Sequence, residues 1–192
     1  MSIHEFAHAW VARLQGDYTA EEMGRVTLNP IRHIDPLGTI ILPVLLLVST
    51  GGKIGFGWAK PVPVNPLNFR DPRRGLLLVS LAGPASNICL AIVSGLIIRI
   101  GGLGASQPLG FVLISITILN LYLAFFNLIP VPPLDGSGVV ASLLPSHLAI
   151  GYERFGRYGT LIVLGLIFFG LIRILAGVPA MALFTLLTGR PY

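Results

Sequence analysis

Long apolar stretches separated by short polar segments dominate this chain of 192 residues. Two of them, residues 76–98 and 109–128, are long enough to cross a bilayer as helices, which takes about 20 residues. A third stretch, residues 159–187, is interrupted near Gly177 and Pro179, so it is either one span with a tail or a helical hairpin. The pattern predicts an all-α polytopic membrane protein with about four to five membrane segments.

Two further segments precede these spans and need a different explanation. Residues 37–50 are apolar but short, and Pro43 interrupts them, so we expect a re-entrant or interfacial segment. Residues 51–75 are rich in Gly, Pro and Val, and residues 57–65 look extended, with prolines that strands tolerate only at edges. We therefore expect a small β hairpin or edge strand near residues 53–65.

Composition supports a membrane protein and argues against a nucleic-acid partner. The chain is 54% hydrophobic and 11% charged, whereas soluble proteins carry about 25% charged residues. The net charge is +5, but the basic residues lie in loops between the apolar stretches and form no stripe along a helix. The expected partner is therefore a lipid bilayer with anionic headgroups. We expect a multi-pass protein of the plasma membrane, and the positive-inside rule predicts that most basic loops lie on the cytoplasmic side.

Candidate chemistry begins in the sequence His4-Glu5-Phe6-Ala7-His8. On a helix, His4 and His8 share one face and can offer two imidazole nitrogens to one metal ion. Glu5 lies beside His4, where its carboxylate can act as a general base on a water molecule. This is the His-Glu-x-x-His pattern of zinc metalloproteases, which needs a third ligand from elsewhere. The alternative is two unrelated polar residues on an amphipathic helix.

Asp135 is the best candidate for the third ligand. Of the eight acidic residues, Glu5 and Asp135 lie within or against apolar surroundings, where an ionisable group usually marks a functional site. Asp135 could also cap a helix that begins at Gly136, and one side chain can do both. His33 is a rival ligand, but its polar neighbours at residues 29–36 favour a solvated loop histidine.

Several other residues in the apolar segments have two interpretations each. Asn127 could bind the backbone of an opened substrate or be a satisfied polar residue where Pro130 breaks a helix. Asn87 is either a substrate contact or a hydrogen-bonding residue between helices. Gly83 and Pro84 are expected to be a close-packing point and a kink.

On these motifs the chain resembles the site-2 proteases, the M50 family of intramembrane zinc metalloproteases. The His-Glu-x-x-His sequence matches the family's zinc-binding helix. The segment from Asn127 through Pro130 to Asp135 and Gly136 matches the second signature, whose aspartate is the third zinc ligand in the family. The Gly-Pro pair and Asn87 match an element on the intervening helix.

The resemblance covers nearly all of residues 1–145, the expected catalytic membrane core, and is weak over the C-terminal membrane segments at 146–192. It implies an endopeptidase with one Zn²⁺ ion that hydrolyses peptide bonds in or near transmembrane segments of other membrane proteins. We expect no PDZ or CBS domain within these 192 residues. Residues 57–65 could hold the substrate in extended form or be a structural hairpin. Two alternatives stay open. One is a catalytically inactive relative that binds membrane helices, suggested by the short helix before His4. The other is a metal-binding membrane transporter.

Overall fold

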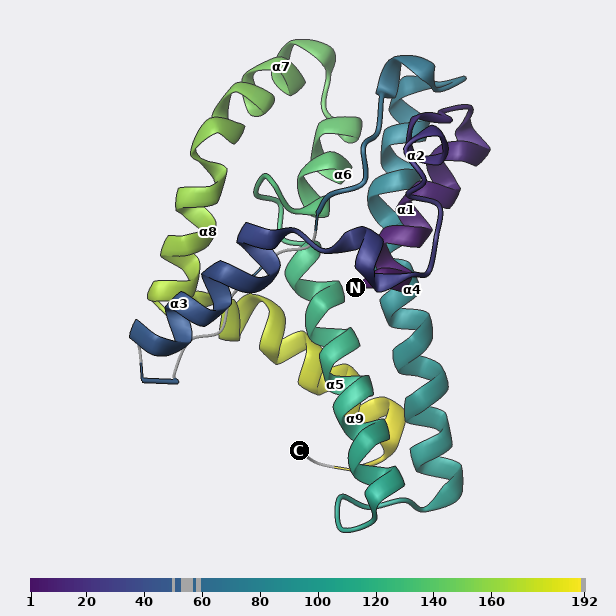
Figure 1. Cartoon of the computed structure of the whole chain (residues 1–192), viewed down its shortest axis with the longest axis vertical. Helices are drawn as coiled ribbons and strands as arrows, with labels where there is room; N and C mark the ends of the chain where they lie inside the picture. Colours follow the sequence, from purple (N-terminus) through teal and green to yellow (C-terminus); the bar gives the residue numbers. More distant parts are fainter. Residues whose placement is uncertain (50, 53–56, 58–59, 191–192) are drawn as a thin grey trace. The chain divides into compact units, whose positions relative to one another are not determined.

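The computed structural model describes the chain apart from residues 50, 53–56, 58–59 and 191–192 (Figure 1). The described residues form helices and connecting segments, with no strand among them. They divide into two compact units, Met1–Gly75 and Leu76–Tyr192. The boundary falls in the first turn of the long helix α4, Pro72–Gly101.

The first unit is built from short helical elements and begins with the helix that carries the two histidines. Its elements are α1 Ser2–Gln15, α2 Thr19–Glu22, the 3₁₀ turn η1 Pro30–His33, the π-helical η2 Pro36–Ile41, α3 Leu42–Ser49 and the 3₁₀ turn η3 Pro66–Asn68. Gly16 ends α1 in the left-handed conformation, with φ 106°. Its N–H donates to the Arg13 carbonyl, and the Asp17 N–H donates to the Ala12 carbonyl. These bonds satisfy carbonyl groups that a helix end leaves without partners.

The fully buried carboxylate of Asp17 joins the end of α1 to the segment that precedes α4. Its Oδ1 accepts hydrogen bonds from the Thr19 hydroxyl and N–H and from Asn68 Nδ2 at 2.9 Å, and its Oδ2 accepts one from the Asn65 N–H at 2.7 Å. Burial raises the pKa of Asp17, but the hydrogen bonds from Thr19, Asn65 and Asn68 outweigh it and hold the pKa below its ordinary value. A buried charge with this many donors is well satisfied, so Asp17 fixes the C-terminal end of α1.

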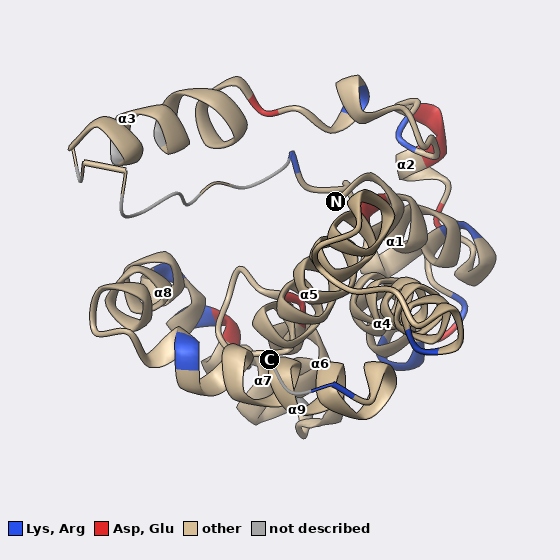
Figure 2. Cartoon of the chain, turned by 90° about the horizontal axis from the view of Figure 1, so that it is seen from below, with Lys and Arg blue, Asp and Glu red and all other residues tan. Residues whose placement is uncertain are grey.

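The second unit contains the two longest helices of the described chain. After α4 come α5 Pro108–Asn127, α6 Asp135–Leu143, α7 Ser146–Phe155, the 3₁₀ turn η4 Gly156–Tyr158, α8 Gly159–Phe168, the π-helical η5 Arg173–Gly177 and α9 Val178–Thr188. Helix α5 carries no charged residue (Figure 2), as expected of a helix that faces lipid along much of its length.

The core of the second unit lies where α4, α5 and α9 meet. Figure 1 shows α5 and α9 side by side, and the two helices are in contact. Ser94 Oγ on α4 and Thr117 Oγ1 on α5 form a buried hydrogen bond of 2.7 Å. The fully or nearly fully buried side chains of the cluster are Ala91, Leu121, Ala180 and Phe184. Small residues let the helices approach closely, and the hydroxyl pair links them inside the apolar core.

The predicted number of membrane segments is wrong. Among the described residues, α4 and α5 are long and apolar enough to cross a membrane, by length and composition. The helical stretches His147–Phe168 and Arg173–Thr188 would add a third span if they formed one bent segment, with a bend of 80°. This gives two to three spans in place of four to five. The break between the two stretches contains Gly170, whose left-handed φ of 71° is a conformation that glycine adopts without strain.

The predicted β hairpin near residues 53–65 is not seen. Residues 53–56 and 58–59 of that prediction lie outside the described part of the chain. Residues 60–65 have no regular secondary structure. The Lys60 N–H donates to the His33 carbonyl at 2.9 Å, but Pro61 and Pro63 have no N–H with which to continue a ladder.

Candidate metal centre

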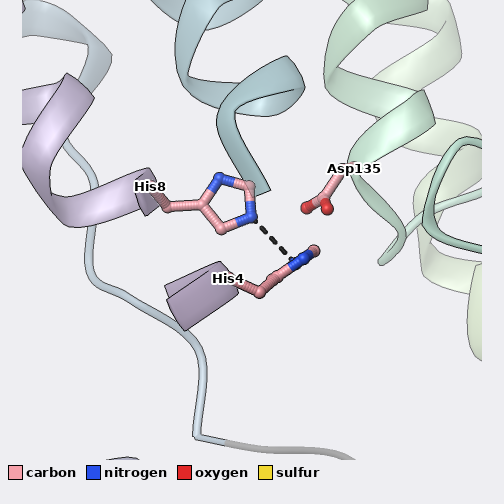
Figure 3. Close-up of side chains that lie close together, drawn as sticks. All are labelled: His4, His8 and Asp135. Carbon is pink, nitrogen blue, oxygen red and sulfur yellow. Dashed lines mark hydrogen bonds between the residues drawn. The ribbon is translucent and has the colours of Figure 1, made fainter. Parts of the chain in front are cut away.

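Helix α1 places the side chains of His4 and His8 on one face. The two residues are one turn apart, and their Nε2 atoms lie 3.1 Å from each other (Figure 3). Both side chains are buried, and their rings meet edge to face with centroids 4.7 Å apart. Helical spacing alone brings the two residues to one face. The rotamers then turn both Nε2 atoms toward a common point.

This separation fits a pair of zinc ligands. Zinc binds imidazole nitrogen at about 2.0–2.1 Å in tetrahedral geometry, which places two such nitrogens about 3.3 Å apart. The observed 3.1 Å is close to that distance, so a small rotation of either ring accommodates an ion. Neutral imidazole is also the form of histidine that binds metals. The two histidines therefore fit two of the ligand positions of a zinc site.

Glu5 lies on the same helix, next to His4 in sequence. Its side chain is 8% exposed, in a helix that places His4, His8, Ala9 and Ala12 in buried positions as well. A carboxylate is rarely buried without a chemical or structural reason. The first unit thus holds the pair of histidines and the carboxylate of the sequence motif on one buried helix face.

Asp135 belongs to the second unit, where it is the first residue of α6. Figure 3 draws its carboxylate from that helix. Leu134 occupies the N-cap position of α6, so Asp135 starts the helix and does not stand before it as a cap. A Cβ atom on Gly136 would lie 2.6 Å from the Ile129 carbonyl oxygen. Only glycine fits this approach, and it fixes the backbone beside Asp135 against the turn that follows α5.

The remaining predicted site residues all lie in the second unit. Asn127 is the last residue of α5, and its Nδ2 donates to the Leu123 carbonyl at 3.0 Å. The Pro130 carbonyl, in the turn after α5, accepts a hydrogen bond of 2.8 Å from the Tyr152 hydroxyl of α7. The three residues predicted on the intervening helix belong to α4, and all three are buried: Gly83, Pro84 and Asn87.

An apolar cavity of about 430 Å³ lies against the same turn. It is lined by Leu128, Ile129, Pro130 and Val131, together with side chains from α5, α8 and η5. None of the described residues in its lining is charged. The segment that leads to Asp135 is therefore bordered by a space suited to an apolar group.

Two residues of the first unit differ from the sequence-based expectation. His33 is 3% exposed, and its Nε2–H donates to the Thr27 carbonyl at 2.8 Å, so the prediction of a solvated histidine is wrong. Asp17 has a structural role that the sequence reasoning missed. A signal for it was present, because an aspartate after a helix-ending glycine and two residues before a threonine commonly makes such local hydrogen bonds.

Comparisons with known proteins assign the class. A family model described as Peptidase family M50 matches residues 103–170. The chain is 43% identical over 170 residues to "Putative zinc metalloprotease YwhC" of Bacillus subtilis. The aligned region covers 85% of this chain and 74% of that protein. It is 32% identical over 168 residues to "Putative zinc metalloprotease Rip2" of Mycolicibacterium smegmatis. That aligned region covers 87% of this chain and 62% of the relative.

These matches define a metalloprotease, and the apolar helices are those of a membrane protein. The chain belongs to peptidase family M50, which confirms the resemblance to site-2 proteases. It spans about three-fifths of the length of the Mycolicibacterium relative. No solved structure matches it significantly.

Proposed function

We propose that this protein is an intramembrane zinc metalloendopeptidase. One zinc ion is held by His4, His8 and Asp135, and Glu5 is the general base. The observation that carries the proposal is the pair of buried Nε2 atoms 3.1 Å apart on α1, beside the buried Glu5. Two imidazoles and a carboxylate are a common ligand set for catalytic zinc and leave one position open.

The residues of the chain divide the chemistry between them. Zinc, when bound, polarises the scissile carbonyl and lowers the pKa of the attacking water. The Glu5 carboxylate takes a proton from that water while the oxygen of the water forms a bond to the carbonyl carbon. Glu5 then gives the proton to the leaving nitrogen as the C–N bond breaks. The products are a free carboxyl group and a free amine, so the atoms of one water molecule are consumed.

We propose the transmembrane segments of other membrane proteins as substrates. Peptide bonds in lipid are engaged in helical hydrogen bonds, so a substrate must unwind locally before it can be cut. Asn127 donates its Nδ2–H to Leu123, which leaves Oδ1 to accept an N–H of the opened strand. The apolar cavity beside Ile129 and Val131 suits a substrate side chain. Asn87 is a second candidate contact, and Pro130 and Gly136 shape the turn.

The direct test replaces Glu5 by Gln and measures both cleavage of a helical membrane substrate and zinc content. General-base catalysis contributes about 10²–10⁴-fold to a rate, so we expect cleavage to fall at least about 100-fold while zinc stays bound. Glu22→Gln is the matched control, because Glu22 is exposed at the end of α2. A non-catalytic relative would show no cleavage by the wild type. A transporter would move zinc into vesicles equally well with either residue at position 5.

We further propose a multi-pass arrangement in the plasma membrane with the basic loops in the cytoplasm. Support comes from the apolar helices α4 and α5 and from the positive-inside rule. In a Cys89→Ala background, Arg70→Cys and Ser106→Cys report on opposite ends of α4. An impermeant maleimide added to intact cells should label the cysteine at position 106 and leave the one at position 70 unlabelled. The reverse labelling pattern would refute the proposed orientation.

A further inference from the structure

Three cations of the first unit line one cavity that the proposed mechanism does not use. The cavity has a volume of about 550 Å³ and is lined by Arg25, Arg32 and Lys60. The rest of its lining consists of the apolar side chains of Met23, Ile31 and Ile34. A lining made of cations and apolar side chains suits an anion that has an apolar portion.

Hydrogen bonds join the segments that carry the three cations, although these segments are distant in sequence. The Arg25 guanidinium donates to the Arg32 carbonyl, which joins the loop after α2 to η1. The Lys60 N–H donates to the His33 carbonyl at 2.9 Å, which joins the segment before η3 to the same turn. His33 is itself anchored, because its Nε2–H donates to the Thr27 carbonyl. The backbone around the cavity and the Arg25 guanidinium are therefore held in place, while the Arg32 and Lys60 side chains are exposed and can reach a ligand.

The charges in this cavity are not balanced within the described chain. No carboxylate lines it, and none of the three cations forms an ion pair among the described residues. Arg25 is 8% exposed, and a buried guanidinium is costly unless an anion accompanies it. One of its five N–H donors is used for the Arg32 carbonyl, so others can still bind an anion. Bringing three like charges together costs energy that a bound anion recovers.

The apolar part of the lining continues onto the surface of the same segment. Ile31 is 72% exposed and Met23 is 59% exposed. Leu28, between them in sequence, is 57% exposed. In a membrane protein, exposed apolar side chains beside cations mark a surface at the level of the lipid headgroups. A lipid supplies both parts of the expected ligand, since its phosphate can meet the cations while its acyl chains cover the apolar side chains.

We propose that this cavity binds the phosphate group of an anionic phospholipid, with Arg25, Arg32 and Lys60 as its ligands. The planar guanidinium of arginine matches the geometry of phosphate oxygens, and lysine adds a point charge. Met23, Ile31 and Ile34 contact the glycerol backbone and the start of the acyl chains. The site lies in the first unit and takes no part in peptide-bond hydrolysis.

The test measures lipid binding to the full chain in detergent by native mass spectrometry. Phosphatidylglycerol is the anionic probe, and phosphatidylcholine is the zwitterionic comparison. The double variant Arg32→Gln/Lys60→Gln removes the two exposed cations and keeps the buried Arg25. Each cation near a lipid surface contributes on the order of 1 kcal/mol, so we expect phosphatidylglycerol to bind about 10- to 30-fold more weakly to the variant.

The control Arg70→Gln/Arg154→Gln removes the same net charge at two exposed positions that do not line the cavity. It should bind phosphatidylglycerol as the wild type does. The charge-preserving variant Arg32→Lys/Lys60→Arg should also retain binding, and its thermal unfolding curve reports whether substitution at these positions preserves the fold. Equal loss in the cavity and control variants, or no loss in either, would overturn the proposal. Displacement of the lipid by an equal concentration of glycerol phosphate would also overturn it, because the site would then be one for a soluble phosphate.

Discussion

At the scale of residues, the first unit buries the polar side chains of His4, His8, Asp17 and His33, among others. A spacing of four residues places His4 and His8 on one face of a helix, whatever the rest of the chain does. Asp17 and His33 are buried by segments that are distant in sequence. The local pattern indicates the hydrogen bonds from Thr19 to Asp17, but not the burial, because burial of a loop residue depends on which distant segment packs over it.

Asp17 gives a prediction about stability. Both of its oxygens accept hydrogen bonds, so Asp17→Asn replaces one acceptor by a donor that faces the Asn65 N–H or the Thr19 and Asn68 donors. We expect the free energy of unfolding at neutral pH to fall by about 2–3 kcal/mol, as for loss of a charge-assisted hydrogen bond with buried partners. Thermal unfolding in detergent measures this. Glu22→Gln, at an exposed position, should leave the unfolding temperature unchanged.

The pH dependence of this effect has a defined sign. The pKa of Asp17 is below its ordinary value of 3.8 in the folded chain. The unfolded chain therefore binds a proton first as the pH falls, so the stabilisation by Asp17 is complete above about pH 4–5 and is lost below it. The difference in unfolding temperature between wild type and Asp17→Asn should shrink as the pH is lowered from 5 toward 3. A difference that stays constant over that range would show that the carboxylate charge is not responsible.

At the scale of elements, long apolar stretches were easier to predict than their breaks. The predicted spans at residues 76–98 and 109–128 correspond to α4 and α5, which extend only a few residues beyond or short of them. The stretch at residues 159–187 left one span or a hairpin open, and the structure has helices α8 and α9 with a bend of 80° between their helical stretches. An apolar stretch predicts that a segment is buried in lipid or protein, but it does not predict where the chain turns within that segment.

Glycine positions in these helices give a matched pair of predictions. A Cβ atom on Gly95 of α4 would lie 2.9 Å from the Leu187 Cβ of α9, whereas one on Gly165 of α8 would have no atom within 4 Å. Gly95→Ala should therefore lower the free energy of unfolding by about 1–3 kcal/mol through overpacking. Gly165→Ala should raise it by up to about 1 kcal/mol, because alanine favours the helix. Equal effects of the two substitutions would show that α4 and α9 do not pack at Gly95.

At the scale of the whole molecule, the proposed zinc ligands come from both compact units. His4 and His8 are in the first unit, and Asp135 is in the second. The resemblance to site-2 proteases predicted a ligand set of this kind from two distant motifs. The division into a core at residues 1–145 and a C-terminal part at 146–192 remains a prediction. Residues 60–65, the described end of the predicted β hairpin, form no strand, and Pro61 and Pro63 there have no N–H to donate to a strand partner.

The most direct test of the account is the zinc content of the purified chain with and without Asp135. Wild type should contain about one zinc per chain, and Asp135→Ala should lose most of it. Loss of a residue that only supports a metal ligand already weakens metal binding about 10- to 100-fold, so loss of a ligand itself should weaken it at least as much. Glu153→Ala removes an exposed carboxylate from the same unit and should keep the zinc. Unchanged zinc content in Asp135→Ala would contradict the proposal that one ion is shared by His4, His8 and Asp135.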